Sequence, residues 1–479
     1  MNGWSSDKAW NEECGVFAAV GVARASEITA LGLHALQHRG QEATGVVSCD
    51  ERGDFHVLKG IGLVSDVYDS ANLGELPGQL AIGHNRYSTA GGLTLENTQP
   101  LRVVYRGGPL ALAHNGNLTN AASLRASLEE SGSIFQTTLD TEVFLHLVAL
   151  SQQDDLEDAL AEAARQVRGA YSIVVLTREK VIALRDPHGF RPLCVGRLGD
   201  GYVVASETCA LDLVGADFLR EIEPGEMLTL DPQGMRSRRA VTAADPPQHC
   251  IFEHIYFSRP DSVVFGATVD QVRRRLGHQL AREHPANADL VIAVPDSSNS
   301  IALGYAEESG LRFELGLIRN HYVGRTFIQP QQAGRDFGVR VKFNPVREIL
   351  DGRRVVVVDD SIVRGTTSRK LVRLLRRSGA REVHFRIGSP PVTHPCFYGI
   401  DTPSRRELIG ALKTVAEIRE YLGVDTLGYV SLDGMLACED APRRFCRACF
   451  DGVYPVAVED RAGKLAIEHL RRSPAGSGR

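Results

Sequence analysis

The sequence lacks several features that would assign a protein to a broad class at once. It has no basic excess, since 54 lysine and arginine residues stand against 59 aspartate and glutamate residues in a chain of 479. Extended nucleic-acid surfaces usually need that excess, so we expect no nucleic-acid partner. No apolar run approaches the roughly 18–20 residues that cross a membrane, and the first thirteen residues have no apolar core like that of a secretory signal. We therefore expect a cytoplasmic protein with no membrane partner.

Cysteine is also scarce, at nine residues in the whole chain. A sparse and odd-numbered set does not build a disulfide framework. We expect reduced thiols, which remain available as nucleophiles or as metal ligands. The chain also has no G-x-x-x-x-G-K-[ST] motif, which argues against the phosphate-binding loop of P-loop enzymes.

The first half of the chain, residues 14–240, has many short apolar runs separated by Gly, Asn and Asp. This pattern predicts stacked β-strands with helices between them. One predicted helix, Leu156–Val167, has apolar residues three and four apart, as an amphipathic helix requires. The polar residues that follow contain a Pro-Pro pair and predict a linker at 241–260.

The second half changes to a rhythm of strand, loop and helix over residues 261–425. Leu290–Pro295 and Arg354–Val358 are continuous apolar runs, and Thr366–Arg377 reads as a helix. Buried strands that alternate with helices are typical of a parallel sheet covered on both faces. Residues 426–479 form a C-terminal segment that ends in a polar tail.

A loop in the second half carries the most informative motif. An apolar strand ends at Asp359 and Asp360, and a turn with Gly365 and several hydroxyls then enters a helix. Ligands of open α/β sheets bind at the carboxyl ends of strands, and a helix N-terminus offers N–H groups to a phosphate. The two carboxylates suit ribose hydroxyls or a hard cation such as Mg²⁺.

This segment, VVVVDDSIVRGTTS, resembles the phosphoribosyl pyrophosphate loop of type I phosphoribosyltransferases. Ser297, at the end of an earlier strand, is a candidate to join the two aspartates at Mg²⁺, and Lys342 is a candidate to meet the pyrophosphate. The resemblance implies that the loop holds phosphoribosyl pyrophosphate through Asp359, Asp360, Ser361, Arg364, Gly365, Thr366 and Thr367.

A cysteine near the start of the chain, Cys14, offers a second site. An isolated cysteine before apolar residues is most often a buried core residue. If residues 1–13 were a propeptide that is cleaved off, Cys14 would carry both a thiol and an α-amine. The amine has an ordinary pKa near 8 and could act as the base for its own thiol.

Three further motifs suit the same site. Arg86 in GHNRYST can take a carboxylate in a forked hydrogen bond. The Asn115 amide and the Gly116 N–H in HNGNL are the donor types of an oxyanion hole. Asp140 in LDTE can pair with an ammonium group. These groups together fit an amino-acid amide, and glutamine is the obvious candidate.

The ordered motifs CGVF, LQHRGQE, HNRYST, HNGNL and LDTE resemble a class II glutamine amidotransferase domain of the N-terminal-nucleophile type. Joined to the second half, the chain resembles the amidophosphoribosyltransferase family. The resemblance implies stacked antiparallel sheets between helices, fused to a phosphoribosyltransferase domain with a parallel sheet. It also implies that Arg39 helps to bind glutamine, that ammonia displaces pyrophosphate to give 5-phosphoribosylamine, and that the enzyme is a homotetramer inhibited by purine nucleotides.

Four other cysteines suggest a metal centre. Cys446 and Cys449 form a C-x-x-C pair, while Cys250 and Cys396 stand far away in the sequence. If the fold gathers them, four thiolates suit tetrahedral zinc or a [4Fe–4S] cluster, and the spacing does not choose between these. The resemblance to the propeptide-bearing branch of the family implies the [4Fe–4S] cluster, with Cys438 as an alternative ligand.

Two alternative functions are compatible with part of the pattern. A glucosamine-6-phosphate synthase shares the glutaminase half, but it needs a sugar isomerase half in place of the phosphoribosyl pyrophosphate loop. A regulator could use a phosphoribosyltransferase fold to sense phosphoribosyl pyrophosphate while binding DNA. The acidic balance and the complete set of glutaminase motifs argue against this second alternative.

Overall fold

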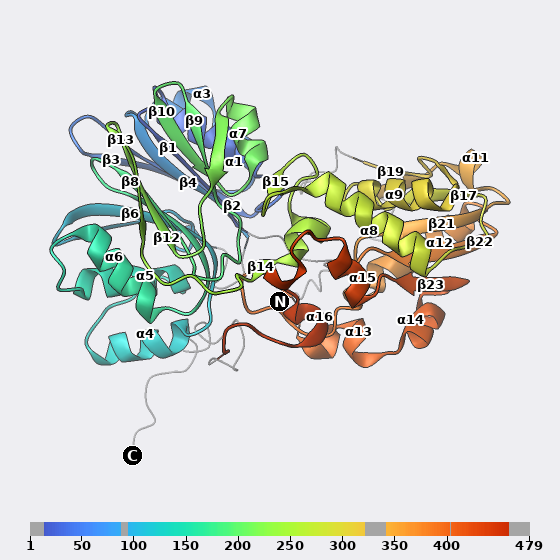
Figure 1. Ribbon diagram of the computed structural model, residues 1–479. Coiled ribbons are helices and arrows are strands. Elements are labelled where there is room, and N and C mark those ends of the chain that lie inside the picture. The colour runs from blue at the N-terminus through green and yellow to red at the C-terminus, as the bar shows by residue number, and fades with distance from the viewer. Residues whose placement is uncertain (1–13, 88–93, 321–341, 403, 459–479) are drawn as a thin grey trace, which may run out of the picture.

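The computed structural model describes residues 14–87, 94–320, 342–402 and 404–458. Two bodies lie side by side, one of stacked antiparallel sheets and one built on a parallel sheet (Figure 1). The predicted propeptide, residues 1–13, and the end of the predicted C-terminal segment lie outside the described residues. No helix in the described part of the chain is long and apolar enough to cross a membrane.

The first antiparallel sheet has seven strands, with β1 directly after Cys14 and close to the centre. Its outer face packs on α1 (Ala25–Ala35) and α7 (Thr208–Val214) through small and branched apolar side chains. The short helices α2 (Val64–Val67) and α3 (Ser70–Leu73) follow β3. The strand order is β11 (Asp217–Glu221), β9 (Cys194–Leu198), β10 (Gly201–Ala205), β1 (Gly15–Val20), β4 (Leu80–Arg86), β2 (Ala43–Cys49) and β3 (Phe55–Ile61).

The second antiparallel sheet has six strands and stacks on the first through a buried apolar layer. Its other face is covered by α4 (Ala121–Glu130), α5 (Asp140–Leu150) and α6 (Leu156–Gln166). The strand order is β13 (Gly234–Arg239), β12 (Glu226–Asp231), β8 (Val181–Arg185), β7 (Gly169–Leu176), β6 (Gly108–Leu118) and β5 (Leu101–Tyr105). The predicted arrangement of stacked antiparallel sheets between helices is therefore confirmed.

The second body is a parallel sheet of five strands. Alternate residues of its central strands face α8 (Val269–Glu283) and α9 (Asn299–Ser309) on one side, and α12 (Thr366–Arg377) and α14 (Val415–Leu422) on the other. This confirms the predicted parallel sheet. The strand order is β18 (Arg312–Phe313), β17 (Leu290–Ala293), β21 (Arg354–Asp359), β22 (Glu382–Ile387) and β23 (Thr426–Tyr429), so the sheet continues past residue 425.

Smaller elements complete the second body and join it to the first. The strand β14 (His249–Cys250), within the predicted linker, pairs in parallel with β24 (Phe445–Cys446) near the C-terminal end of the described chain. The π-helical turn η1 (Glu253–Phe257) follows β14 and is almost wholly buried. The others are β15 (Val263–Val264), β16 (Ala267–Thr268), β19 (Leu317–Arg319), β20 (Phe343–Pro345), α11 (Arg347–Leu350), η2 (Arg405–Glu407), α13 (Ile409–Leu412), α15 (Leu432–Ala437), η3 (Pro442–Arg444) and α16 (Ala448–Asp451).

Candidate active sites

Cys14 lies at the entry to β1, buried within the first body. Its thiol donates to the carbonyl of Tyr87, with 3.5 Å between sulfur and oxygen. The next residue, Gly15, is paired with Asn85 of the neighbouring strand β4. The end of β4 carries Arg86, itself buried, so the fold brings the predicted nucleophile close to the predicted carboxylate binder.

The predicted oxyanion donors lie on β6, in the second sheet. The Nδ2 group of Asn115 is buried and has no hydrogen-bond partner within the described residues. A buried amide donor without a partner costs free energy, which is offset when a ligand or a transition state accepts from it. Gly116 has φ of +147°, and a Cβ there would lie 2.1 Å from the carbonyl oxygen of Ala170, so only glycine fits.

Asp140 is the first residue of α5 and lies against the same strand. Its carboxylate accepts from the N–H of Leu118 at 2.9 Å and lies 3.7 Å from Nδ1 of His114. Burial alone would raise the pKa of Asp140, but His114 and these hydrogen bonds hold it below its usual value. The carboxylate is therefore ionised at neutral pH, as an ammonium partner requires.

Arg39, which the family resemblance placed at the glutamine site, has neighbours from within the protein. Its Nε donates to the carbonyl of Cys14 at 3.2 Å. Its two terminal nitrogens donate to the carboxylate of Glu253 at 3.0 and 2.7 Å, and one of them also donates to Glu207 at 2.5 Å. The side chain is fully buried. Arg39 thus holds the main chain of Cys14, and its guanidinium is already engaged by two carboxylates.

The two aspartates of the second site stand at the carboxyl end of β21. Ser297 donates to one oxygen of Asp360 at 2.5 Å, and Ser361 donates to the other at 2.6 Å. The fold therefore brings together the three predicted Mg²⁺ ligands, although they lie in separate segments. Burial, and then the charge of Asp360, raise the pKa of Asp359; burial also raises that of Asp360. Two buried like charges suit a site whose ligand carries cations.

The loop after the aspartates leads directly into α12. Gly365 caps that helix with φ of +74°, and a Cβ there would lie 2.9 Å from a methyl group of Ile409. Thr366 and Thr367 form the first turn, where N–H groups lack partners within the helix. Arg364 forms an ion pair with Glu407 at 2.8 Å. Lys342 is exposed and precedes β20.

The four predicted metal-ligating cysteines come from three parts of the chain. The pairing of β14 with β24 sets Cys250 directly opposite Cys446. The carbonyl of Cys449 accepts from the N–H groups of Thr393 and His394, just before Cys396. Burial, and then the nearby thiols of Cys446, Cys250 and Cys396, raise the pKa of Cys449. The four thiols therefore lie close enough to interact.

The chemistry of these four cysteines fits a metal centre, because a metal would favour the thiolate forms that burial opposes. All nine cysteines are described, and none of them forms a disulfide bond. Across the described ranges, no three His, Cys, Asp or Glu side chains are arranged to hold a single metal ion. The alternative ligand Cys438 donates its thiol to the carbonyl of Gly434 in its own helix, at 3.2 Å.

The segment around Cys396 also contacts the glutaminase half, which sequence reasoning missed. The Asn117 amide, two residues after Asn115, donates to the Phe397 carbonyl at 2.9 Å. Arg191 donates twice to the carbonyl of Tyr398, at 3.1 and 2.7 Å. The sequence offers one kind of signal for buried polar contacts, which is a charged residue inside an apolar run. Glu253 in CIFEHIYF is an example, because a charged residue that is buried is nearly always paired.

Comparisons with known proteins agree with both halves of the structure. A family model described as a glutamine amidotransferase domain matches residues 84–213. The amidophosphoribosyltransferase of Bacillus subtilis (strain 168) is 51% identical over 458 residues, which is 94% of this chain and 96% of that protein. A chloroplastic relative, amidophosphoribosyltransferase 2 of Arabidopsis thaliana, is 53% identical over 459 residues, which is 95% of this chain and 82% of the relative.

Solved structures match over nearly the whole chain. Glutamine phosphoribosylpyrophosphate amidotransferase from B. subtilis, complexed with ADP and GMP, has a TM-score of 0.89 at 50% identity and covers 94% of this chain and 98% of its own. A structure described as the allosteric regulatory enzyme of purine biosynthesis has a TM-score of 0.90 at 50% identity. The chain therefore belongs to the amidophosphoribosyltransferases, the glutamine amidotransferases that catalyse the first step of purine biosynthesis.

Proposed function

We propose that Cys14 is the nucleophile of the glutaminase half. Its thiolate attacks the side-chain carbonyl carbon of glutamine, and the oxyanion that forms accepts from Asn115 Nδ2 and the Gly116 N–H. The single observation that carries this assignment is the buried Nδ2 group of Asn115, which has no partner among the described residues. A preformed donor of this kind waits for a charge that develops only in the transition state.

The proton of the Cys14 thiol passes to the α-amine of the same residue, which requires that residues 1–13 be removed as a propeptide. The amine then gives the proton to the departing ammonia. Water hydrolyses the thioester and releases glutamate. This arrangement uses no other side chain as base, and the Cys14 thiol is held by a carbonyl oxygen, that of Tyr87.

Glutamine is held at its other end by charge. Arg86 takes the α-carboxylate, and Asp140 takes the α-ammonium. Support for the second role comes from the lowered pKa of Asp140, which keeps the carboxylate ionised although it is buried. Both residues lie beside the strands that carry the reacting groups, β4 and β6.

Phosphoribosyl pyrophosphate binds in the second half, at the 361–368 loop and the end of β21. Asp359 and Asp360 hold ribose hydroxyls and, with Ser297, Mg²⁺, which when bound would offset the charge of the pyrophosphate. The N–H groups of Thr366 and Thr367 meet the phosphate, and Lys342 and Arg364 add positive charge. Ammonia attacks C1 of the ribose, pyrophosphate leaves and 5-phosphoribosylamine forms. Ammonia would be protonated in bulk water, so it passes between the halves inside the protein.

Cys250, Cys396, Cys446 and Cys449 hold a [4Fe–4S] cluster. Their gathering from three parts of the chain supports this, since a cluster there would tie the strand after the first body to the C-terminal segment. The role of the bound cluster would be structural, and its oxidation would break the link between these two segments.

Purine nucleotides are the proposed inhibitors of this enzyme. The B. subtilis structure with ADP and GMP supports inhibition by purine nucleotides. A homotetramer and a cytoplasmic location remain predictions, to be tested by light scattering and by fractionation.

The decisive experiment measures glutamine hydrolysis with and without phosphoribosyl pyrophosphate, together with product formation from glutamine and from ammonia. We expect both nitrogen sources to give 5-phosphoribosylamine. Product from neither source would contradict the proposed roles of both sites. The intact mass of the active protein shows whether residues 1–13 have been removed. Active protein that retained Met1 would rule out the α-amine of Cys14 as the base.

A further inference from the structure

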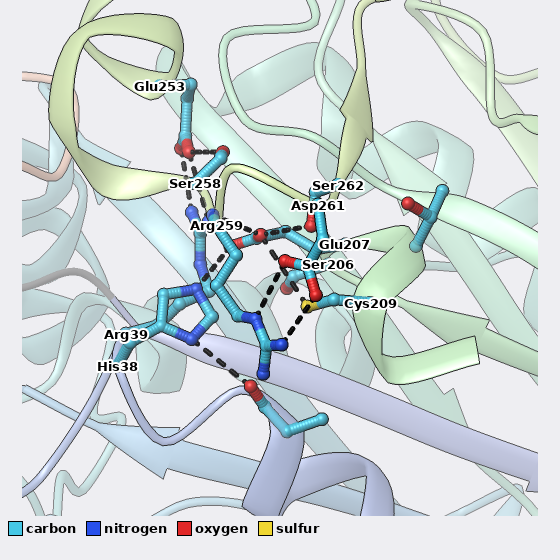
Figure 2. Close-up of polar contacts among 12 residues, drawn as sticks. His38, Arg39, Ser206, Glu207, Cys209, Glu253, Ser258, Arg259, Asp261 and Ser262 are labelled. Atoms are coloured by element: carbon cyan, nitrogen blue, oxygen red, sulfur yellow. Dashed lines mark hydrogen bonds and ion pairs between the residues drawn. The ribbon is translucent and has the colours of Figure 1, made fainter. Parts of the chain in front are cut away.

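A group of buried charges lies directly behind Cys14 and has no role in the chemistry just proposed. It consists of two arginines, Arg39 and Arg191, and two glutamates, Glu207 and Glu253, all four fully buried. Figure 2 shows Arg39, Glu207 and Glu253 together, with His38 at one side and Ser258 and Ser262 beside the carboxylates. Buried charges are costly to desolvate, so a set that is retained calls for a reason other than stability.

The first link of this group reaches the nucleophile. Arg39 Nε donates to the carbonyl of Cys14, and that carbonyl is bonded to the Cα atom, which carries the amine and the side chain with the thiol. The following residues are fixed from the other side, since the N–H of Val16 donates to the hydroxyl of Ser206 at 3.0 Å, next to Glu207. A shift of Arg39 would therefore move Cys14 along with it.

The second link holds Arg39 in place. Glu207 accepts from Arg39 at 2.5 Å and from His38 at 2.7 Å, and its other oxygen accepts from Ser262 at 2.7 Å. Burial would raise the pKa of Glu207, but the charges of His38 and Arg39 hold it well below its usual value. Glu253 takes both ends of the Arg39 fork. A forked pair of this kind fixes direction as well as distance.

The third link belongs to the second body. Glu253 opens the turn η1, 214 residues away from Arg39 along the chain. Its carboxylate also accepts from the hydroxyl of Ser258 at 2.6 Å. Arg273 of α8 holds the same turn, donating to the carbonyls of His254 and Ser258 at 2.8 Å each. Burial lowers the pKa of Arg273 to about 10, and the charge of Asp360, in the proposed phosphoribosyl pyrophosphate site, opposes that shift.

We propose that Glu253 is a positioning residue for glutamine hydrolysis: through Arg39 it fixes the main chain of Cys14, so that a carboxylate from the second body sets the geometry of the nucleophile in the first. This inference rests on the proposed role of Cys14. It gives Arg39 a positioning role in place of glutamine binding. It also means that the nucleophile is correctly placed only when the two bodies are docked.

The test uses the processed, cluster-loaded enzyme, without residues 1–13, and compares Glu253→Gln with Glu439→Gln. Glu439 is the matched control, a buried carboxylate of the second body held by His254 at 2.9 Å and outside this group. We expect Glu253→Gln to lower kcat for glutamine hydrolysis by about 10²-fold, with KM within about threefold, because small displacements of reacting groups cost roughly that much. Synthesis from ammonia and Tm should match those of Glu439→Gln.

A milder pair of variants keeps the test informative if Glu253→Gln folds poorly. Ser258→Ala removes one hydrogen bond from the Glu253 carboxylate and should lower kcat by a smaller factor in the same direction. Arg39→Ala should lose glutaminase turnover and regain part of it with millimolar methylguanidine, which replaces the missing group. Labelling of Cys14 by a glutamine-analogue chloroketone should slow in parallel.

Three outcomes would overturn the inference. A raised KM with unchanged kcat in Arg39→Ala would return Arg39 to glutamine binding. Equal loss of glutamine-dependent and ammonia-dependent synthesis, with a lower Tm, would make the group merely structural. Wild-type kinetics in Glu253→Gln would remove it from the reaction. Failure of the proposed function itself would look different, since then Cys14 of the wild-type enzyme would not react with the chloroketone at all.

Discussion

The two halves of this chain build their sites in opposite ways. The proposed phosphoribosyl pyrophosphate site is nearly continuous in sequence, because one strand end and one helix start, Asp359 to Thr367, supply most of it. The proposed glutamine site draws on β1, β4 and β6, which belong to two stacked sheets, and on the start of the helix α5. A parallel sheet gathers polar groups at one edge, whereas an antiparallel sandwich must bring them together by stacking.

The contrast extends to electrostatics. In the second site, burial and the charge of Asp360 raise the pKa of Asp359. The ionised forms of the two carboxylates are therefore unfavourable until a cation binds beside them. In the first site, His114 and main-chain hydrogen bonds lower the pKa of Asp140. This carboxylate is therefore already stabilised in its ionised form by groups of the protein. One half is prepared for a cation-bearing ligand and the other for a zwitterion. The predictions below test whether the two sites can be separated in this way.

The largest expected effect comes from removing the proposed nucleophile, which should separate glutamine-dependent from ammonia-dependent synthesis. Cys14→Ala should reduce glutamine-dependent synthesis by at least about 10³-fold, because no other group supplies the nucleophile. Synthesis from ammonia should stay within about threefold of the wild-type rate. Cys49→Ala, a buried thiol of β2 that contacts main-chain carbonyls, is the control. Loss of both activities in a folded Cys14→Ala enzyme would contradict the separation.

The mirror experiment removes a carboxylate from the second site. Asp360→Asn should lower synthesis from both nitrogen sources by roughly 10²-fold or more, because the site loses charge where the ligand brings cations. Glutamine hydrolysis measured without phosphoribosyl pyrophosphate should be nearly unchanged. Asp289→Asn serves as the control, since Asp289 pairs with Arg354 at the opposite end of the same strands. A large loss in that control would point to the sheet rather than the site.

The thiol group that joins the halves should respond next. The proposed cluster would give the protein visible absorption and bound iron; Cys449→Ser should remove both, and it should cost several kcal/mol of stability, as the loss of a structural metal centre does. Cys438→Ser should keep both, because that thiol already bonds to Gly434. A colourless wild-type protein with stoichiometric zinc, purified without air, would refute the cluster.

A smaller effect is expected at the substrate end of the glutamine site. Asp140→Asn should raise KM for glutamine by about 10–100-fold, which corresponds to one charged hydrogen bond. The kcat value should change less, because the nucleophile and the oxyanion donors stay in place. Asp155→Asn, which alters the N-cap of the neighbouring helix α6, is the control. An unchanged KM would show that Asp140 serves only the N–H of Leu118.

The smallest effect concerns pH and the turn η1 of the second body. His254 donates from both ring nitrogens, to Glu439 and to the carbonyl of Val264, which requires the imidazolium form. Burial lowers the pKa of His254, but Glu439 outweighs it and raises the pKa above the usual value. The pair thus contributes its full stability below pH about 6.5 and loses it as pH rises through the raised pKa.

We therefore expect the free energy of unfolding of the wild-type protein to exceed that of His254→Gln by more at pH 6 than at pH 9, by an amount on the order of 1 kcal/mol. Calorimetry at one scan rate measures this. A constant difference at both values of pH would mean that the imidazole is neutral in the folded protein.

Much of the second half could be read from the sequence. The predicted helix Thr366–Arg377 matches α12, and the strand predicted at Arg354–Val358 matches β21 within one residue. Both follow from local patterns: a continuous apolar run, a glycine that caps, and an amphipathic repeat. The roles of the site residues, by contrast, remain predictions that rest on matching motifs.

The first half was harder because its contacts are distant. Arg39 matched a motif and was predicted to bind glutamine, yet it bonds to Cys14, Glu207 and Glu253. Nothing in the sequence near Arg39 indicates two carboxylates that lie more than 160 residues away. Such pairs depend on how the sheets and the turn η1 pack, and the local periodicity of a sequence does not carry that information.

The sequence by itself determined the parts of this protein that are encoded over short stretches: two different sheet types, a glycine-containing loop at a strand end, a cysteine before an apolar strand, and nine cysteines that are too sparse and odd in number for a disulfide framework. Only the tertiary structure decided which groups meet. It set Cys250 opposite Cys446, left the Asn115 amide buried without a partner among the described residues, and placed a carboxylate of one body behind the nucleophile of the other. The physical reason is that burial and charge pairing are properties of the packed interior, where groups hundreds of residues apart share one low-dielectric environment.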